Sequence, residues 1–269
     1  NDIDEKGACA LAQVYSIPSS HNLHTLACVA FTSHPMKSFP ATLLVMIFLA
    51  STAIILLATT SAVSDPHQNP IRLKQPVPVG LFVMSKCPDT VFCEHVFQAV
   101  LCNVSVPTTL DVNYLGEVDP AEKPFGALCK HGPLECLGNA QELCFRSVYP
   151  DVRDWFSFVS CLNRKFWQIG EDGYAEECGE YCGNMQPEAR ISDVKKTGKD
   201  YEPISDCIAS GEGGELLRAS IRKTESWGVN KSCTMFINNK LRCIHDGEWK
   251  DCDGGHKVDD FVRDIEEAY

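Results

Sequence analysis

The chain has 269 residues, a formal net charge of −12 and 15 cysteines. An acidic chain without a basic stripe repels phosphate and has no bound counterions to release, which excludes nucleic acid as a partner. So many cysteines favour a compartment in which disulfides persist. A zinc site is the weaker interpretation, because the close pair Cys178 and Cys182 has no matching histidine pair.

The N-terminal part indicates an exported protein. Residues 1–35 begin without a methionine and show no clear period, so we interpret them as a non-native upstream extension. Residues 36–62 predict a signal peptide, with Lys37 as the positive region, an apolar stretch at 41–58 and a small-x-small cleavage pattern after it. The alternative is a signal anchor, and we expect contact with a membrane only in that case.

Removal of these segments changes the cysteine count. Without Cys9 and Cys28, thirteen cysteines remain, and an odd number predicts at least one thiol that is free or paired between molecules. Residues 63–78 are rich in proline and predict a linker, after which residues 79–269 have the size of one domain.

The domain opens with a nearly continuous apolar run at residues 79–84, which predicts a strand buried on both faces. Cys87 and Pro88 end this strand, and Pro88 suits the first turn of a helix. The apolar face of that helix is predicted to consist of Phe92, Cys93, Val96, Phe97 and Val100.

Strands and helices also alternate along the rest of the domain. A second strand is predicted at 110–115, and a cysteine-rich, mainly helical segment then runs to about Cys182. Further on we expect a helix at 214–227, strands at 234–237 and 241–244 joined at Asn238 and Asn239, and a final amphipathic helix that carries Val258, Phe261, Val262 and Ile265. This order predicts an α/β, thioredoxin-like fold with a disulfide-rich helical insertion.

The most constrained stretch, residues 129–144, reads CKHGPLECLGNAQELC. It resembles the signature of the gamma-interferon-inducible lysosomal thiol reductase family, C-Q-H-G-x-x-E-C-x-x-N-x-x-x-x-C, and differs only at Lys130, where the family has glutamine. A cysteine-rich secreted loop with this spacing by chance is the alternative. The resemblance extends over residues 79–269 and implies the same fold. Its motif residues here are Cys129, His131, Gly132, Glu135, Cys136, Asn139 and Cys144.

Reactive chemistry is expected at Cys87, where the first strand meets the first helix. The positive end of the helix dipole and Lys86 favour the thiolate that attacks a disulfide, whereas Asp89 opposes it. The alternative is a Cys87 locked in a structural disulfide. In the family the reactive cysteine usually begins a C-x-x-C pair, but Thr90 occupies the second position here, and a hydroxyl cannot resolve a mixed disulfide.

Thr90 leaves three hypotheses open. These are a monothiol mechanism resolved by an external thiol, a relocated resolving cysteine, and a silent family member. Cys93 lies nearly two helical turns from Cys87 and is expected in the core or in a structural disulfide. Cys233 is the better candidate for a resolving or facing thiol, because thioredoxin-like proteins carry a cis-proline there, opposite the reactive cysteine. No proline is present here, and a structural disulfide between Cys233 and Cys87 is the alternative.

Most other cysteines are interpreted as a disulfide framework around the insertion. Cys243 and Cys252 bracket His245, Asp246 and Gly247, which we expect to form a turn clipped by a disulfide. His131 is a candidate for acid–base chemistry or substrate contact, with a structural hydrogen-bonded histidine as the alternative. The framework cysteines are Cys129, Cys136, Cys144, Cys161, Cys178, Cys182 and Cys207.

These observations predict a thiol oxidoreductase that reduces or exchanges protein disulfides through Cys87 in a secreted, lysosomal or vacuolar setting. We expect no metal and no organic cofactor, with disulfide-containing proteins as substrates and a small or protein thiol as reductant. Asn103 and Asn230 begin N-x-S sequons and are predicted glycosylation sites. The second interpretation is a non-catalytic secreted binding module that has lost the resolving thiol.

Overall fold

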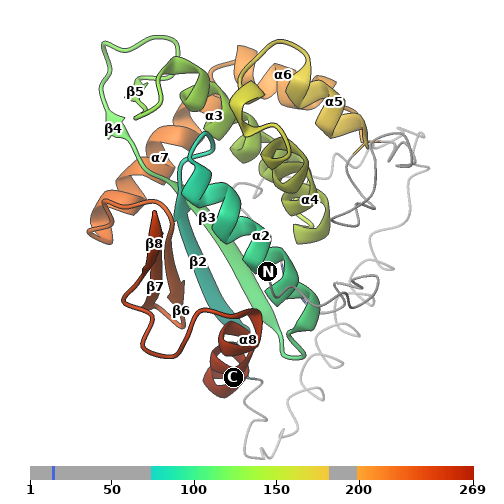
Figure 1. Ribbon diagram of the computed structural model, residues 1–269. Helices are drawn as coiled ribbons and strands as arrows, with labels where there is room; N and C mark the ends of the chain where they lie inside the picture. Colours follow the sequence, from blue (N-terminus) through green and yellow to red (C-terminus); the bar gives the residue numbers. More distant parts are fainter. Residues whose placement is uncertain (1–13, 16–73, 182–198) are drawn as a thin grey trace, which may run out of the picture. The chain divides into compact units, whose positions relative to one another are not determined.

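A computed structural model describes residues 14–15, 74–181 and 199–269, all within one of the two units into which the chain divides (Figure 1). The predicted signal peptide lies outside the described residues, as do Cys9, Cys28 and Cys182. No helix in the described ranges combines the length and the apolar character that crossing a membrane requires.

The central sheet has the strand order β1-β3-β2-β6-β7-β8, and a separate hairpin pairs β4 with β5. β2 runs parallel to β3 and antiparallel to β6, and β6 runs antiparallel to β7. The strands are β1 (Val14–Tyr15), β2 (Val77–Val83), β3 (Thr108–Tyr114), β4 (Glu117–Val118), β5 (Ala127–Leu128), β6 (Thr234–Ile237), β7 (Lys240–Asp246) and β8 (Glu248–Lys250).

The helices fall into a core set and an inserted set. The parallel pair β2 and β3 is connected through α2, while α7 and α8 flank the antiparallel strands in sequence. The insertion between β3 and α7 carries α3 to α6. The helices are α2 (Pro88–Asn103), α3 (Pro133–Val148), α4 (Val152–Asn163), the 3-10 helix η1 (Phe166–Gln168), α5 (Tyr174–Tyr181), α6 (Glu202–Ala209), α7 (Glu212–Ser226) and α8 (Val258–Ala268).

This topology confirms the predicted thioredoxin-like fold. A β-α-β half joined to an antiparallel β-β-α half, with the strand order β3-β2-β6-β7, is the arrangement that defines this fold. The turn at Asn238 and Asn239 is also confirmed, because both residues adopt positive φ angles, of 50° and 62°, as a tight hairpin requires.

Side chains from both halves close the core. α2 lies in front of β3 in Figure 1, and Phe97 of α2 packs on Phe261 of α8 with ring centroids 5.4 Å apart. α7 covers the backbone of β3 at Tyr114, since the Tyr114 N–H donates to Ser220 Oγ and the Thr224 hydroxyl donates to the Tyr114 carbonyl. These bonds satisfy backbone groups that β2 does not reach.

Disulfides fasten the insertion as predicted. Cys144 of α3 is bonded to Cys207 of α6, and Cys161 of α4 is bonded to Cys178 of α5. A helical segment with little core of its own gains stability from such links, because they restrict the unfolded chain. A further framework bond among the described residues joins Cys129 to Cys136.

Two local predictions are wrong. Phe92 was expected on the buried face of α2 but is 48% exposed, because its ring stacks on His245 at the surface. His245 and Asp246 were expected in a turn but complete β7, and Gly247, with φ of 73°, makes the turn to β8. The clip between Cys243 and Cys252 is present.

Candidate active site

Cys87 lies at the N-cap of α2, directly after β2 and its short exit loop. It is the free cysteine among the residues that the structure describes, and 5% of it is exposed. Its neighbours in a small apolar cluster are Phe82, Met84 and Leu115. A helix N-terminus places backbone N–H groups and the positive end of the dipole beside the sulfur, which favours its thiolate.

Thr90 occupies the position of the usual resolving cysteine and is fully buried. Its Oγ1 accepts a hydrogen bond from the Met84 N–H at 3.1 Å and lies 2.7 Å from Ser232 Oγ. The hydroxyl therefore ties the first turn of α2 to the end of β2 and to the loop before β6. It cannot itself exchange with a disulfide.

The loop that faces α2 contains a cis peptide bond between Ser232 and Cys233. Cys233 was expected to face Cys87 as a thiol or to bond with it, but its sulfur is bonded to Cys93 instead, with a Cα–Cα distance of 6.4 Å. Thr90, whose hydroxyl contacts Ser232, lies one helical turn before Cys93. Cys93 on the helix and Cys233 on the facing loop are the next residues along, and they therefore meet in the core. The expectation of a structural role for Cys93 is confirmed.

The family signature is attached to the loop before Cys87. Asn139 of α3 accepts a hydrogen bond from the Ser85 N–H at 3.1 Å, and the Ser85 hydroxyl donates to the Glu135 carbonyl at 3.5 Å. Both Asn139 and Glu135 are fully buried. The signature thus positions the segment that carries Cys87, the candidate reactive cysteine.

Gly138, which the sequence reasoning did not single out, allows this close approach. A Cβ at this position would lie 2.1 Å from Ile169 Cγ2 and 2.9 Å from Ser85 Oγ. Only a glycine lets α3 pack so closely, although a single sequence gave no sign that this position was constrained.

The remaining signature residues form the start of α3. Gly132 is the N-cap with φ of 88°, a backbone conformation that favours glycine. The imidazole Nδ1 of His131 bonds the buried carboxylate of Glu135, and the His131 N–H donates to the same carboxylate at 3.3 Å. The acid–base role predicted for His131 stays a prediction, since its contacts are within the signature itself.

Lys86 is held on the insertion. Its ammonium donates to the carbonyl oxygens of Trp167 and Ile169, both at 2.7 Å. Burial lowers the pKa of Lys86, against the opposing effect of the carboxylates of Glu171 and Glu135. The ammonium group of Lys86, the residue before Cys87, is therefore held by η1 and by Ile169, which follows η1.

A histidine that the sequence analysis placed in a turn belongs to this site. Asp89 Oδ2 lies 3.8 Å from Cys87 Sγ, and Asp89 Oδ1 lies 2.7 Å from His245 Nδ1. A signal that could have indicated His245 was its strand partner, because the backbone of His245 pairs with that of Cys233.

Other candidate features lie apart from these residues. Asn103 and Asn230 are exposed, as glycosylation requires, and their modification stays a prediction. No group of three or more His, Cys, Asp or Glu side chains within the described ranges is arranged to hold a metal.

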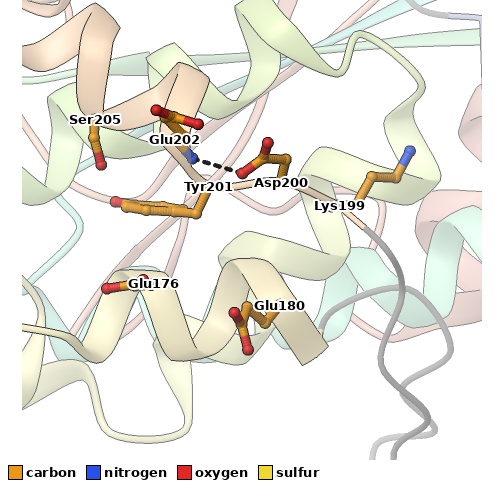
Figure 2. Close-up of a pocket in the computed structure, with 7 residues that line it drawn as sticks. All are labelled: Glu176, Glu180, Lys199, Asp200, Tyr201, Glu202 and Ser205. Atoms are coloured by element: carbon orange, nitrogen blue, oxygen red, sulfur yellow. Dashed lines mark hydrogen bonds between the residues drawn. The ribbon is translucent and has the colours of Figure 1, made fainter.

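A pocket between α5 and the start of α6 includes none of the residues predicted from the sequence (Figure 2). Its lining residues are Glu176, Glu180, Lys199, Asp200, Tyr201, Glu202 and Ser205.

The fold and the free cysteine at the N-terminus of α2 together define a thioredoxin-like protein with one candidate reactive thiol. Residues 78–182, which contain Cys87 and the whole signature, match the sequence model of the family described as gamma interferon inducible lysosomal thiol reductase (GILT). This match confirms the resemblance to that family seen in the sequence. None of the curated proteins matches the chain significantly.

Solved structures similar to this chain include thiol-disulfide proteins of bacteria. BdbD from Bacillus subtilis is 13% identical, with a TM-score of 0.46, and the match covers 72% of this chain and 87% of that one. DsbA from Chlamydia trachomatis is 14% identical, also with a TM-score of 0.46, over 78% and 93% of the two chains. A putative protein-disulfide isomerase from Pseudomonas syringae is 13% identical, with a TM-score of 0.43, over 71% and 93%. The fold assignment rests on the strand order.

Proposed function

We propose that the domain is a disulfide reductase or exchange enzyme that acts on protein substrates through Cys87 by a monothiol mechanism. The observation that carries this proposal is the free state of Cys87 at the N-terminus of α2, where the local dipole favours a nucleophilic thiolate. The family match supports thiol chemistry in general.

The reaction proceeds in three exchanges. The Cys87 thiolate attacks one sulfur of a substrate disulfide, a bond forms between them, and the other substrate sulfur leaves as a thiolate. Because Thr90 supplies no second thiol, an external thiol attacks the mixed disulfide and releases the first substrate sulfur. A second external thiol then frees Cys87, so the external thiols supply both electrons.

We place this reaction in a secreted, lysosomal or vacuolar compartment, after removal of residues 36–62. The disulfides of the insertion and the sheet support such a setting, because they persist where the glutathione poise is oxidising. Small thiols or reduced proteins of that compartment are the proposed reductants.

The test is reduction of a denatured disulfide-bonded protein by residues 63–269, with a small thiol as reductant, beside a Cys87→Ser variant. We expect turnover above the rate of the small thiol alone, and its complete loss in Cys87→Ser. The matched control is Cys243→Ser/Cys252→Ser, which removes two sulfurs at the β7 to β8 clip and leaves Cys87 in place.

A non-catalytic binding module is the second candidate, and the contacts of Thr90 favour it. Its hydroxyl bonds Met84 and Ser232 and serves only structure. If the unmutated domain turns over no faster than the small thiol, this second function replaces the first.

A further inference from the structure

Asp89 links the reactive sulfur to a histidine on the far strand of the hairpin. One carboxylate oxygen lies 3.8 Å from Cys87 Sγ, within reach of a thiol hydrogen bond. The other accepts from the Gly247 N–H at 2.8 Å and lies 2.7 Å from His245 Nδ1. A carboxylate can only accept, so Nδ1 of His245 carries a proton in this contact.

The imidazole of His245 is held from several sides. It stacks on Phe92 with ring centroids 4.5 Å apart, and Trp249 meets it edge-on at 4.8 Å. Its backbone N–H and carbonyl pair with Cys233, and Cys233 is bonded to Cys93 of α2. The same helix that carries Cys87 and Asp89 is thus covalently tied to Cys233, the backbone partner of His245.

We propose, building on the proposed thiol chemistry, that Asp89 and His245 are positioning residues that control the reactivity of Cys87: the charge of Asp89 opposes the thiolate, and His245 holds Asp89 and balances that charge. Neither role follows from the family signature, because both residues lie outside positions 129–144.

The proton and the electrons balance through the first exchange. The Cys87 proton passes to water, and the thiolate attacks a substrate sulfur. The substrate S–S bond breaks, its electron pair goes to the leaving sulfur, and that sulfur takes a proton from water.

His245 has an electrostatic part in this step. A negative Asp89 beside Cys87 disfavours a second negative charge on the sulfur, and a protonated imidazole on the other carboxylate oxygen offsets that effect. Histidine changes charge between about pH 5 and 8, so the pair should make Cys87 more reactive on the acidic side of this range than an uncharged partner would. The other charged and titratable groups around the pair are Lys86, Lys231, Asp246, Glu248, Lys250 and His256.

The test compares His245→Gln and Asp89→Asn with the unmutated protein and with His95→Gln, a control histidine exposed on the same helix. Alkylation of Cys87 by iodoacetamide is followed from about pH 5 to about pH 8, the range in which histidine titrates. The peptide that contains Cys87 is quantified by mass spectrometry, and turnover is measured on the same samples. Circular dichroism verifies folding.

The proposal predicts opposite effects of the two substitutions on alkylation. Asp89→Asn removes the negative charge beside the sulfur and speeds alkylation. His245→Gln leaves Asp89 without a charged partner and slows alkylation by about tenfold at the acidic end, while changing it little at the basic end.

Two results would overturn the proposal. One is a His245→Gln profile that coincides with those of the unmutated protein and His95→Gln. The other is an Asp89→Asn variant that alkylates no faster than the unmutated protein. If no protein turns over at all, the proposed function fails, whereas the alkylation profiles still decide whether Asp89 and His245 act on Cys87. If His245→Gln does not fold, the alkylation of Cys87 in Asp89→Asn alone tests the proposal.

Discussion

Thr90 Oγ1 and Ser232 Oγ lie 2.7 Å apart, so a hydrogen bond between two hydroxyl groups joins the helix of the reactive cysteine to the loop that faces it. In a dithiol enzyme of this fold the residue at position 90 would release the substrate. Here it also accepts from the Met84 N–H, so its side chain fixes three segments at once. The site keeps its geometry without a second thiol.

Thr90→Cys should convert the site into a dithiol. We expect a disulfide between residues 87 and 90 on oxidation, and the mixed disulfide between Cys87 and the small thiol should no longer accumulate during turnover. Loss of the hydroxyl contacts should lower the free energy of unfolding by about 1–2 kcal/mol. Mass spectrometry of the quenched reaction measures the adduct, and urea unfolding measures the stability.

Thr90→Ser is the matched control, because it keeps the hydroxyl and adds no sulfur. Its adduct level should equal that of the unmutated protein. If the mixed disulfide between Cys87 and the small thiol persists equally in Thr90→Cys, a sulfur at position 90 cannot reach it. The absence of a second cysteine would then not explain why the protein uses a monothiol mechanism.

The disulfide between Cys93 and Cys233 should act on stability and not as the resolving pair. The bond spans 140 residues, whereas the clip between Cys243 and Cys252 spans 9. Loop entropy therefore predicts that Cys93→Ala/Cys233→Ala loses about 5 kcal/mol of unfolding free energy and that the double alanine variant of the clip loses about 3 kcal/mol. Denaturant unfolding of both variants checks the difference.

Turnover distinguishes the two roles of that disulfide. Below the unfolding transition, the Cys93→Ala/Cys233→Ala variant should reduce substrate with the same dependence on external thiol as the unmutated protein. Complete loss of turnover in a folded variant would revive Cys233 as a relocated resolving cysteine.

Sequence periodicity predicted the elements that carry the site, since β2, α2 and β3 have buried residues at the spacing of strands and helices. It misplaced Phe92, because helical spacing cannot tell a buried aromatic residue from an exposed one that packs on the rings of His245 and Trp249. The short strand β8 was missed, since one apolar residue, Trp249, between two charged residues is too short a run to reveal the alternation of a strand.

The pairing of cysteines was the part of the site that sequence could not give. The position of Cys233 before β6, where thioredoxin-like proteins carry a cis-proline, suggested that it faces Cys87. Cys87 caps α2 and Cys93 lies on it, and the packing of Thr90 on Ser232 sets Cys233 opposite Cys93. His245 was missed for the same reason, because its contact with Asp89 joins positions 156 residues apart.

The stability of the domain should rise as the pH falls from about 7 to about 4.5. Burial raises the pKa of Glu94 from 4.5 to about 7, against a hydrogen bond from Asn163. In this window the folded protein holds a proton that the unfolded chain has released, so unfolding free energy decreases with rising pH and levels off above the folded value. For Glu94 the change is about 3 kcal/mol.

The pKa of a second buried carboxyl, that of Glu142, is shifted in the same direction. Burial, together with the charge of Glu94, raises the pKa of Glu142, whose carboxylate accepts from the Tyr114 hydroxyl at 2.5 Å. Glu94→Gln should flatten much of the slope of urea midpoint against pH, whereas Glu225→Gln, an exposed substitution on α7, should leave it unchanged. Equal slopes in all three proteins would mean that Glu94 is ionised in the folded state.

Asn139→Ala should disturb the reactive site from the signature helix. The substitution leaves the buried N–H of Ser85 without its acceptor, two residues before Cys87, and this should lower the free energy of unfolding by about 1–3 kcal/mol. Because the loop that holds Cys87 loses a fixed contact, kcat should fall further than global unfolding explains at a temperature where the variant is folded. Ser147→Ala, an exposed substitution on the same helix, is the control and should change neither quantity. A variant that is destabilised yet keeps its full kcat would limit the role of Asn139 to folding and would separate the family signature from the chemistry of Cys87.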